Sequence, residues 1–297
     1  MEHTEREAWR ATLGYWLACG WEFRSGSRLE FDASPPRARV GQRGVGVSVT
    51  PTLPIPAIAS PGHGPVEVDV NRAIPKPPSL PPVVASELPW PAPVPGSERP
   101  ALLAAMATDV AGCSRCSLAH TRTRTVFGVG NPNARVVFVG EGPGAEEDAQ
   151  GEPFVGAAGK LLDQMVRAIG LQRADVYIAN VVKCRPPGNR NPQAEEVAAC
   201  QEYLFRQLAI IRPQILFCLG KFAILCLTGH ADAVGKARGR PFSWRGIPVI
   251  ASFHPAYYLR TPLRKRAAWE DLLRLMKQLR ALESQGAENH AETPPPV

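Results

Sequence analysis

The feature that most constrains the fold is a regular alternation of short apolar runs with amphipathic stretches between residues 136 and 282. The apolar runs predict strands at 136–139, 176–182, 215–219 and 247–251. The amphipathic patterns predict helices at 106–119, 157–169, 192–211, 221–227 and 264–282. Apolar strands that alternate with helices indicate a parallel sheet covered on both faces. We therefore expect an α/β fold, a three-layer α/β/α sandwich around a central, mostly parallel four-stranded sheet.

A glycine-rich acidic loop follows the first predicted strand. Residues 140–148 read Gly-Glu-Gly-Pro-Gly-Ala-Glu-Glu-Asp, and residues 151–156 read Gly-Glu-Pro-Phe-Val-Gly. Ligands of open α/β sheets usually bind at the carboxyl ends of the strands, and glycine allows close backbone approach. Polar residues also end or follow the second and fourth strands, at Asn180, 183–185 and 252–255. These segments are predicted to converge on one cleft.

Composition divides the chain into four parts. Seventeen of the 31 prolines lie between Pro35 and Pro100, in a stretch with few aromatic residues. Such a segment buries too little apolar surface to offset its ordering entropy, so 31–100 is predicted to be a disordered linker. Residues 1–30 are expected to hold one helix, 101–282 the folded domain, and 283–297 a disordered tail.

Charge and cysteine content narrow the class of protein. The formal net charge is +7, and the excess of Lys and Arg lies in the predicted folded domain. This basic domain suggests a polyanionic partner such as nucleic acid. No signal peptide or membrane-spanning run is evident, and seven cysteines do not suit a secreted disulfide framework. The expectation is a monomeric cytoplasmic protein with no membrane partner.

Four of the cysteines form two pairs that are distant in sequence. Cys113 and Cys116 are separated by two residues, and Cys184 and Cys200 flank a loop rich in Arg, Pro and Asn. Four thiolates suit zinc or an iron–sulfur cluster, and His120 is an alternative ligand. The long separation of the two pairs argues mildly against a compact zinc knuckle. Cys218 and Cys226 lie in apolar segments and are predicted to belong to the core.

Residues 105–280 resemble the family 4 uracil-DNA glycosylases, which carry an iron–sulfur cluster. The shared motifs are 140–144, 151–159, 180–192 and His254-Pro255, together with the cysteine spacing. The resemblance implies a domain that flips deoxyuridine out of DNA and hydrolyses its N-glycosidic bond. It also implies that a 4Fe–4S cluster of structural role is held by Cys113, Cys116, Cys184 and Cys200, with zinc as the less favoured occupant.

The resemblance also implies roles for single residues. Phe154 would stack on the base, and the amide of Asn180 would read its edge. Glu141 would position water and oppose positive charge on the sugar, and His254 would donate to uracil O2. The remaining substrate contacts implied are Gly142 through its backbone, Glu147 where a thymine methyl would lie, and Asn189 through a hydrogen bond to the acidic loop.

The segment after His254 is expected to enter the DNA. The DNA contacts implied by resemblance or predicted from charge are Tyr257, Tyr258, Leu259, Arg260 and Arg264. A related branch traps DNA covalently through a histidine in a basic insertion, but 184–190 is short and holds no histidine. No lysine is evidently placed as a nucleophile, so a monofunctional glycosylase is expected.

Three alternatives remain open from the sequence. They are a non-catalytic DNA-binding or polymerase-associated module with a structural metal, a glycosylase of broadened specificity for deaminated bases, and a small-molecule hydrolase. A tether to a repair or replication partner is the expected role of the N-terminal hundred residues.

Overall fold

The computed structural model describes residues 92–291, with side chains described to residue 285. The predicted N-terminal helix, Cys19 and nearly all of the predicted linker lie outside the described residues. Within the described part, no helix is long and apolar enough to span a membrane.

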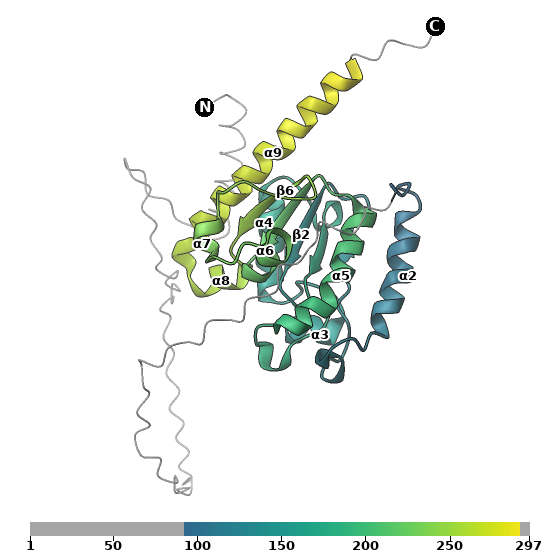
Figure 1. The fold of residues 1–297 in the computed structure, drawn as a ribbon. Helices are drawn as coiled ribbons and strands as arrows, with labels where there is room; N and C mark the ends of the chain where they lie inside the picture. The colour runs from purple at the N-terminus through teal and green to yellow at the C-terminus, as the bar shows by residue number, and fades with distance from the viewer. Residues whose placement is uncertain (1–91, 292–297) are drawn as a thin grey trace, which may run out of the picture. The chain divides into compact units, whose positions relative to one another are not determined.

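The core of the fold is one mixed sheet (Figure 1). Its strands are β1 (Val129–Gly130), β2 (Val136–Gly140), β3 (Tyr177–Asn180), β4 (Ile215–Leu219), β5 (Phe242–Trp244) and β6 (Ile247–Ser252). They lie in the order β1-β3-β2-β4-β6-β5. The four central strands are parallel, and β1 and β5 pair antiparallel at the two edges. The expected mostly parallel sheet is confirmed, but in the described part of the chain it has six strands and not the four predicted.

Helices cover both faces of the sheet. The α-helices are α2 (Arg99–Ala111), α3 (Ala145–Gln150), α4 (Ala157–Ala168), α5 (Ala194–Ile211), α6 (Lys221–Thr228), α7 (Val234–Ala237), α8 (Pro255–Arg260) and α9 (Lys265–Ala291). Residues 92–291 also hold four short 3-10 turns: Ser117–His120, Arg173–Asp175, Pro187–Asn189 and Pro262–Arg264.

Alternate residues of each central strand face opposite layers. Val137 and Val139 of β2 pack in a cluster with side chains of α2, α5 and α6. Val136 and Phe138 pack in a second cluster with α4, α8 and α9. Figure 1 shows α2 and α5 together on one side of the sheet and α9 on the other. Two apolar clusters lie on opposite faces of a sheet whose strands β2, β3 and β4 are buried at every residue, which confirms the three-layer architecture.

Several helix boundaries differ from the predictions for local reasons. The predicted helix 106–119 ends at Ala111 with Gly112 as its C-cap, so both cysteines of the first pair lie beyond it. α5 begins at Ala194 and not at Pro192, because the Glu196 carboxylate accepts a hydrogen bond from the Gln193 backbone N–H. α9 continues to Ala291, past the expected domain end at Leu282.

Candidate active site

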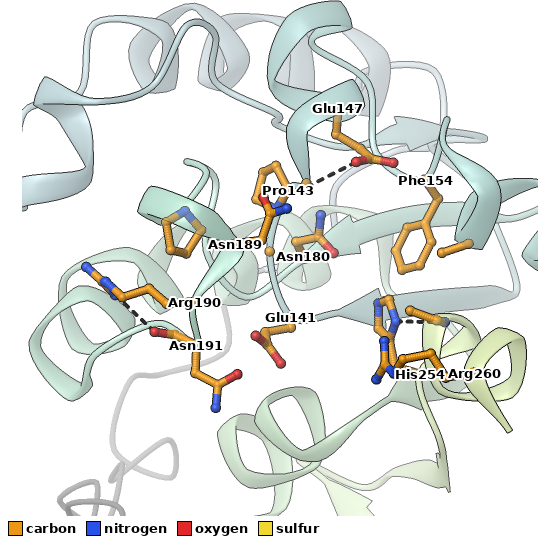
Figure 2. A pocket seen from close by; sticks show the side chains of 15 residues that line it. Glu141, Pro143, Glu147, Phe154, Asn180, Asn189, Arg190, Asn191, His254 and Arg260 are labelled. Atoms are coloured by element: carbon orange, nitrogen blue, oxygen red, sulfur yellow. Dashed lines mark hydrogen bonds between the residues drawn. The ribbon is translucent and has the colours of Figure 1, made fainter. Parts of the chain in front are cut away.

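The carboxyl ends of β2, β3 and β6 open into one cavity of about 410 Å³. It is lined by Glu141, Gly142, Pro143, Gly144, Glu147, Phe154, Ala158, Asn180, Pro186, Asn189, Arg190, Asn191, His254, Ala256 and Arg260. Figure 2 shows Asn180, Phe154, Glu141 and His254 arranged around a common space. All seven residues predicted to act in catalysis or substrate binding therefore line one cavity.

Asn180 ends β3 and is buried, with 1% of its surface exposed. Its side-chain Oδ1 is buried and accepts no hydrogen bond from any described residue. A buried polar atom without a partner is unfavourable, because it has lost its hydrogen bonds to water and no protein donor replaces them. The side chain is thus prepared to receive a donor from a molecule in the cavity.

Gly140 makes room for the two side chains that face each other here. It is the register partner of Asn180 on the neighbouring strand. A Cβ at this position would lie 2.4 Å from Asn180 Oδ1 and 2.7 Å from the Phe154 ring atom Cζ. Residue 140 must therefore be glycine, so that the Asn180 amide and the Phe154 ring can both lie against the end of β2.

Phe154 has a backbone φ of +54°, which is uncommon for a residue with a side chain. The residue is 5% exposed and lines the cavity. Gly159 permits this conformation, because a Cβ there would lie 1.8 Å from the Phe154 carbonyl oxygen. A constrained backbone at a cavity is a frequent property of functional sites.

The Glu147 carboxylate holds the loop that carries Phe154. Its Oε1 accepts hydrogen bonds from the N–H groups of Val155, at 2.9 Å, and Gly156, at 3.0 Å. Its Oε2 accepts one from Gly144 N–H at 3.1 Å. Gly156 also caps the N-terminus of α4, where a carboxylate is favoured by the helix dipole. Glu147 therefore fixes the shape of this wall.

His254 is the N-cap of α8, followed by proline at the first helical position. Its Nδ1 accepts a hydrogen bond from Ala256 N–H at 3.2 Å. Burial lowers the pKa of the imidazole to about 4, with a further contribution from Arg260. A neutral ring that accepts at Nδ1 carries its proton on Nε2, so His254 offers a neutral donor.

Glu141 follows β2 directly. Burial raises the pKa of its carboxyl to about 7. No described side chain donates to the carboxylate, which Figure 2 shows facing the same space as His254. A carboxyl group whose pKa lies near neutral pH is suited to proton transfer or to changes of charge in a reaction.

Two of the predicted site residues behave differently from expectation. The Asn189 Oδ1 accepts a hydrogen bond from Arg185 Nε at 2.7 Å, and within residues 92–285 it makes no bond to the acidic loop. The acidic loop is instead held by Glu147 itself.

Tyr258 is wholly buried and its hydroxyl lies 3.1 Å from Ser252 Oγ, so it is a core residue and not a DNA contact.

The other predicted DNA contacts lie at the surface beside the cavity. Leu259, Arg260 and Arg264 are exposed, whereas Tyr257 is half-buried and stacks on Phe253 with ring centroids 4.6 Å apart. Leu263 is the most exposed large apolar side chain of this segment, at 69%. The sequence reasoning missed it, although its position between proline and arginine in a turn was a usable signal.

The four predicted cysteine ligands line a second, much smaller cavity, together with Lys183. All four are free thiols. Arg122 donates to Cys184 Sγ at 3.3 Å, and the Lys183 backbone N–H donates to Cys200 Sγ at 3.2 Å. Across the described residues, no three His, Cys, Asp or Glu side chains converge closely enough to hold a single metal ion. Cys218 and Cys226 are buried core residues, as predicted.

Lys183 and Arg190 were not among the predicted site residues. Lys183 is 1% exposed, and burial lowers the pKa of its ammonium to about 8. Arg190 lines the larger cavity, and its guanidinium donates to both oxygens of buried Glu196, at 2.6 and 2.9 Å. The dense charge of 183–190 was a signal for both residues.

Comparisons with known proteins agree with this geometry. The Uracil DNA glycosylase superfamily matches residues 127–273. The type-4 uracil-DNA glycosylase of Archaeoglobus fulgidus is 49% identical over 162 residues, which are 52% of this chain and 81% of that protein.

Two further relatives carry the same name. The type-4 uracil-DNA glycosylase of Thermotoga maritima is 48% identical over 54% of this chain and 85% of that protein. That of Sulfurisphaera tokodaii is 43% identical over 56% of this chain and 80% of that protein. Taken with the cavity at the strand ends, these matches place the chain in a family: it belongs to the type-4 uracil-DNA glycosylases of the uracil-DNA glycosylase superfamily.

Proposed function

We propose that this protein flips deoxyuridine out of DNA and hydrolyses the N-glycosidic bond, releasing uracil and leaving an abasic site for base excision repair. The observation that carries the proposal is the unsatisfied Oδ1 of Asn180 in a cavity walled by Phe154. A volume of about 410 Å³ is ample for a pyrimidine and its sugar. A base within a duplex reaches such a pocket only after extrusion.

Recognition would depend on the Asn180 amide. Its Oδ1 can accept the N3–H of uracil, and its Nδ2 can donate to O4. Cytosine has no hydrogen at N3 and carries a donor at position 4, so it would leave buried groups of the protein unpaired. Sites of this kind discriminate strongly, because an unpaired buried polar group is costly. The face of Phe154 would stack on the bound ring.

Rejection of thymine would come from the wall built around Glu147. Its carboxylate is held by three backbone N–H groups, so it cannot easily swing away. The extra methyl group of thymine would meet this fixed wall. Gly142 also lines the cavity, and its backbone would contact the base.

Hydrolysis would use Glu141 and His254. As the bond between C1′ and N1 breaks, its electron pair moves to uracil and positive charge develops on the sugar. The Nε2–H of His254 would donate to uracil O2 as that oxygen becomes negative. The Glu141 carboxylate would oppose the charge on the sugar and orient the water that attacks C1′. The water then gives up its proton to Glu141 or to solvent.

DNA would be held beside the cavity by α8 and the turn after it. Arg260 and Arg264 are exposed and suited to phosphate contacts, and exposed Leu259 is suited to fill the gap left by the flipped nucleotide. The half-buried Tyr257 would support this surface. With no lysine facing the sugar pocket among its lining residues, the enzyme is proposed to be monofunctional.

The cysteine cavity would hold a 4Fe–4S cluster through Cys113, Cys116, Cys184 and Cys200. The four cysteines line one cavity, and four thiolates are the usual ligand set of such a cluster. When bound, the cluster would supply structural support, since the hydrolysis transfers no electrons. In this proposal the enzyme acts as a cytoplasmic monomer, with residues 1–100 as a tether to a repair or replication partner.

The test is excision from matched oligonucleotides that carry one uracil, thymine or hypoxanthine, read as alkali-labile sites. We expect cleavage only on uracil and only after alkali. Asn180→Asp should reduce excision at least about 100-fold, because the carboxylate cannot donate to O4. Lys160→Met on the outer surface of α4 is the control and should not change the rate. Absence of abasic product from protein that still binds DNA would reject the proposal.

A further inference from the structure

Lys183 is a buried cation without a carboxylate partner. Its Nζ donates to the backbone oxygen of Asn180 at 2.9 Å and to Gln207 Oε1 at 2.6 Å. The ammonium also lies over the ring of Phe127, 5.8 Å from its centroid. Among the described residues no Asp or Glu forms an ion pair with it. Neutral acceptors alone compensate poorly for the removal of a charge from water.

The same residue also borders the cysteine cavity. Lys183 lines this cavity, and its own backbone N–H donates to Cys200 Sγ at 3.2 Å. Four thiolates at this site would bring the negative charge that the ammonium lacks. The positive charge of Lys183 therefore favours an anionic centre held by the cysteines.

Lys183 is also connected to the base pocket, because its ammonium binds the backbone of Asn180. The backbone oxygen that it binds belongs to the residue whose Oδ1 faces the cavity unsatisfied. Gln207 braces the ammonium from α5, and its Nε2 donates to Phe127 O at 2.9 Å and to the Tyr177 hydroxyl at 3.2 Å. One buried residue thus connects the cysteine site with the end of β3.

We propose that Lys183 is a positioning residue that couples the anionic cysteine site to Asn180, as counter-ion of the first and anchor of the second. The inference rests on the proposed function, and it assigns a specific structural task to the cysteine site. Loss of the anionic centre would leave the ammonium uncompensated and would loosen the strand end that presents the amide. Misplacement of a reacting group by about 1 Å can reduce a rate by roughly 100-fold.

Two variants test the coupling in the full-length protein with its cluster loaded. Lys183→Met keeps an unbranched side chain, one atom shorter than that of lysine, and removes the charge. Gln207→Glu is isosteric and places a carboxylate against the same ammonium, so it keeps the proposal testable if the first variant fails to fold. Arg115→Met is the control. Arg115 lines the same cavity, but it is exposed, pairs with Glu202 at 2.6 Å and does not touch Asn180.

The measurements are the iron content, the reduction potential of the cluster by film voltammetry, and kcat and KM on uracil-containing DNA. Lys183→Met should lower kcat by about 10- to 100-fold with little change in KM. Both Lys183→Met and Gln207→Glu should move the cluster potential to more negative values, because positive charge near the iron is removed or neutralised. Arg115→Met should leave kcat unchanged.

The outcomes separate this inference from the proposed function. If the wild-type protein excises uracil and both variants keep its kcat and cluster potential, the coupling is wrong and the proposed function stands. If the wild-type protein excises no uracil, the proposed function fails. A potential shift with unchanged kcat would leave Lys183 as a counter-ion only and would overturn its assignment as the anchor of Asn180.

Discussion

The imidazole of His254 stacks against the ring of Phe154, with ring centroids 5.4 Å apart and planes inclined by 27°. One residue begins α8 after β6 and the other lies in the loop before α4. The two segments are separated by about a hundred residues, yet both rings border the same cavity (Figure 2). The pair joins the proposed stacking surface to the proposed hydrogen-bond donor.

His254→Ala should lower kcat for uracil excision by about 10²- to 10³-fold, the usual effect of removing one donor to a developing oxyanion. Because the pKa of His254 is lowered to about 4, its proton on Nε2 is present throughout the neutral range, and the wild-type rate should show no limb from histidine there. Single-turnover assays on a uracil oligonucleotide measure the loss. His230→Ala is the matched control, since His230 is a half-buried histidine that does not line the cavity.

Glu141 predicts a pH dependence with one limb. Its pKa is raised to about 7, and the ionised form is the one that opposes positive charge on the sugar. Excision should therefore rise with pH through about 7 and then level off. In Glu141→Gln the limb should vanish along with most of the activity. A wild-type rate that is flat between about pH 6 and pH 8 would contradict the assigned role.

The same carboxyl predicts a trade between stability and activity. The folded-state pKa of Glu141 lies above its unfolded value of 4.5, so its contribution favours the folded state at low pH and is lost as pH rises through about 7. Glu141→Gln should thus raise the free energy of unfolding at alkaline pH by on the order of 2 kcal/mol. The loss of stability begins above the unfolded pKa of 4.5 and is complete above about 7. Urea denaturation at about pH 4 and at about pH 8.5, which lie outside this window on its two sides, should therefore show the gain at the higher pH.

Gly140→Ala should reduce excision sharply, because its Cβ would lie 2.4 Å from Asn180 Oδ1 and 2.7 Å from Phe154 Cζ. We expect a loss of about 10²-fold or more, from displacement of both groups. Gly112→Ala is the control, since its nearest neighbour would be 3.9 Å away and its φ of −87° suits any residue. Equal rates for the two variants would show that the close approach at Gly140 has no catalytic consequence.

Cys184→Ser should release the iron and the visible absorbance of the proposed cluster, and should lower the thermal midpoint, because two loops would lose their common support. Cys226→Ala is the matched control. Cys226 is also buried, but it lies in α6 outside the cysteine cavity, so its variant should keep the iron. Iron content and absorbance measure both. Full iron in Cys184→Ser would remove this residue from the ligand set.

A truncated chain that begins at residue 92 should excise uracil as fast as the full chain if the N-terminal part only tethers. The cut must not go further, because α2 begins at Arg99 and its guanidinium donates to the Ile211 carbonyl at 2.8 Å. Rates of both forms on one oligonucleotide give the answer. Loss of activity in a folded truncated chain would contradict the tether.

The buried strands were predictable because their sequences carry a strong signal. Residues 215–219 are apolar throughout, and β4 spans Ile215–Leu219. The edge strands β1 and β5 were missed because they span only two or three residues and pair antiparallel, with no periodic pattern. α3 was missed because its acidic sequence resembles a loop, and its stability comes from Glu147 and the left-handed Gly151 at its C-cap.

The site was predictable in its members but less so in their connections. Phe154 and His254 stood out beside proline, and Asn180 stood out as a polar residue within an apolar strand, while their roles came from the family resemblance. The burial of Tyr258 could not be read from the short 255–260 segment, because less than two helical turns show no periodicity. The bond from Lys183 to Asn180 spans three residues, but it depends on where β3 ends, which the apolar pattern placed two residues too late.

The three backbone bonds of Glu147 have a consequence for how the enzyme searches DNA. Because the loop around Phe154 is already ordered before any base arrives, a visiting nucleotide need not organise its own binding site. An ordinary base that enters this rigid space meets a misfit at once and returns to the helix without a slow rearrangement of the protein. Release of undamaged DNA would then not wait for any motion of this loop, because the loop takes its final shape when the protein folds.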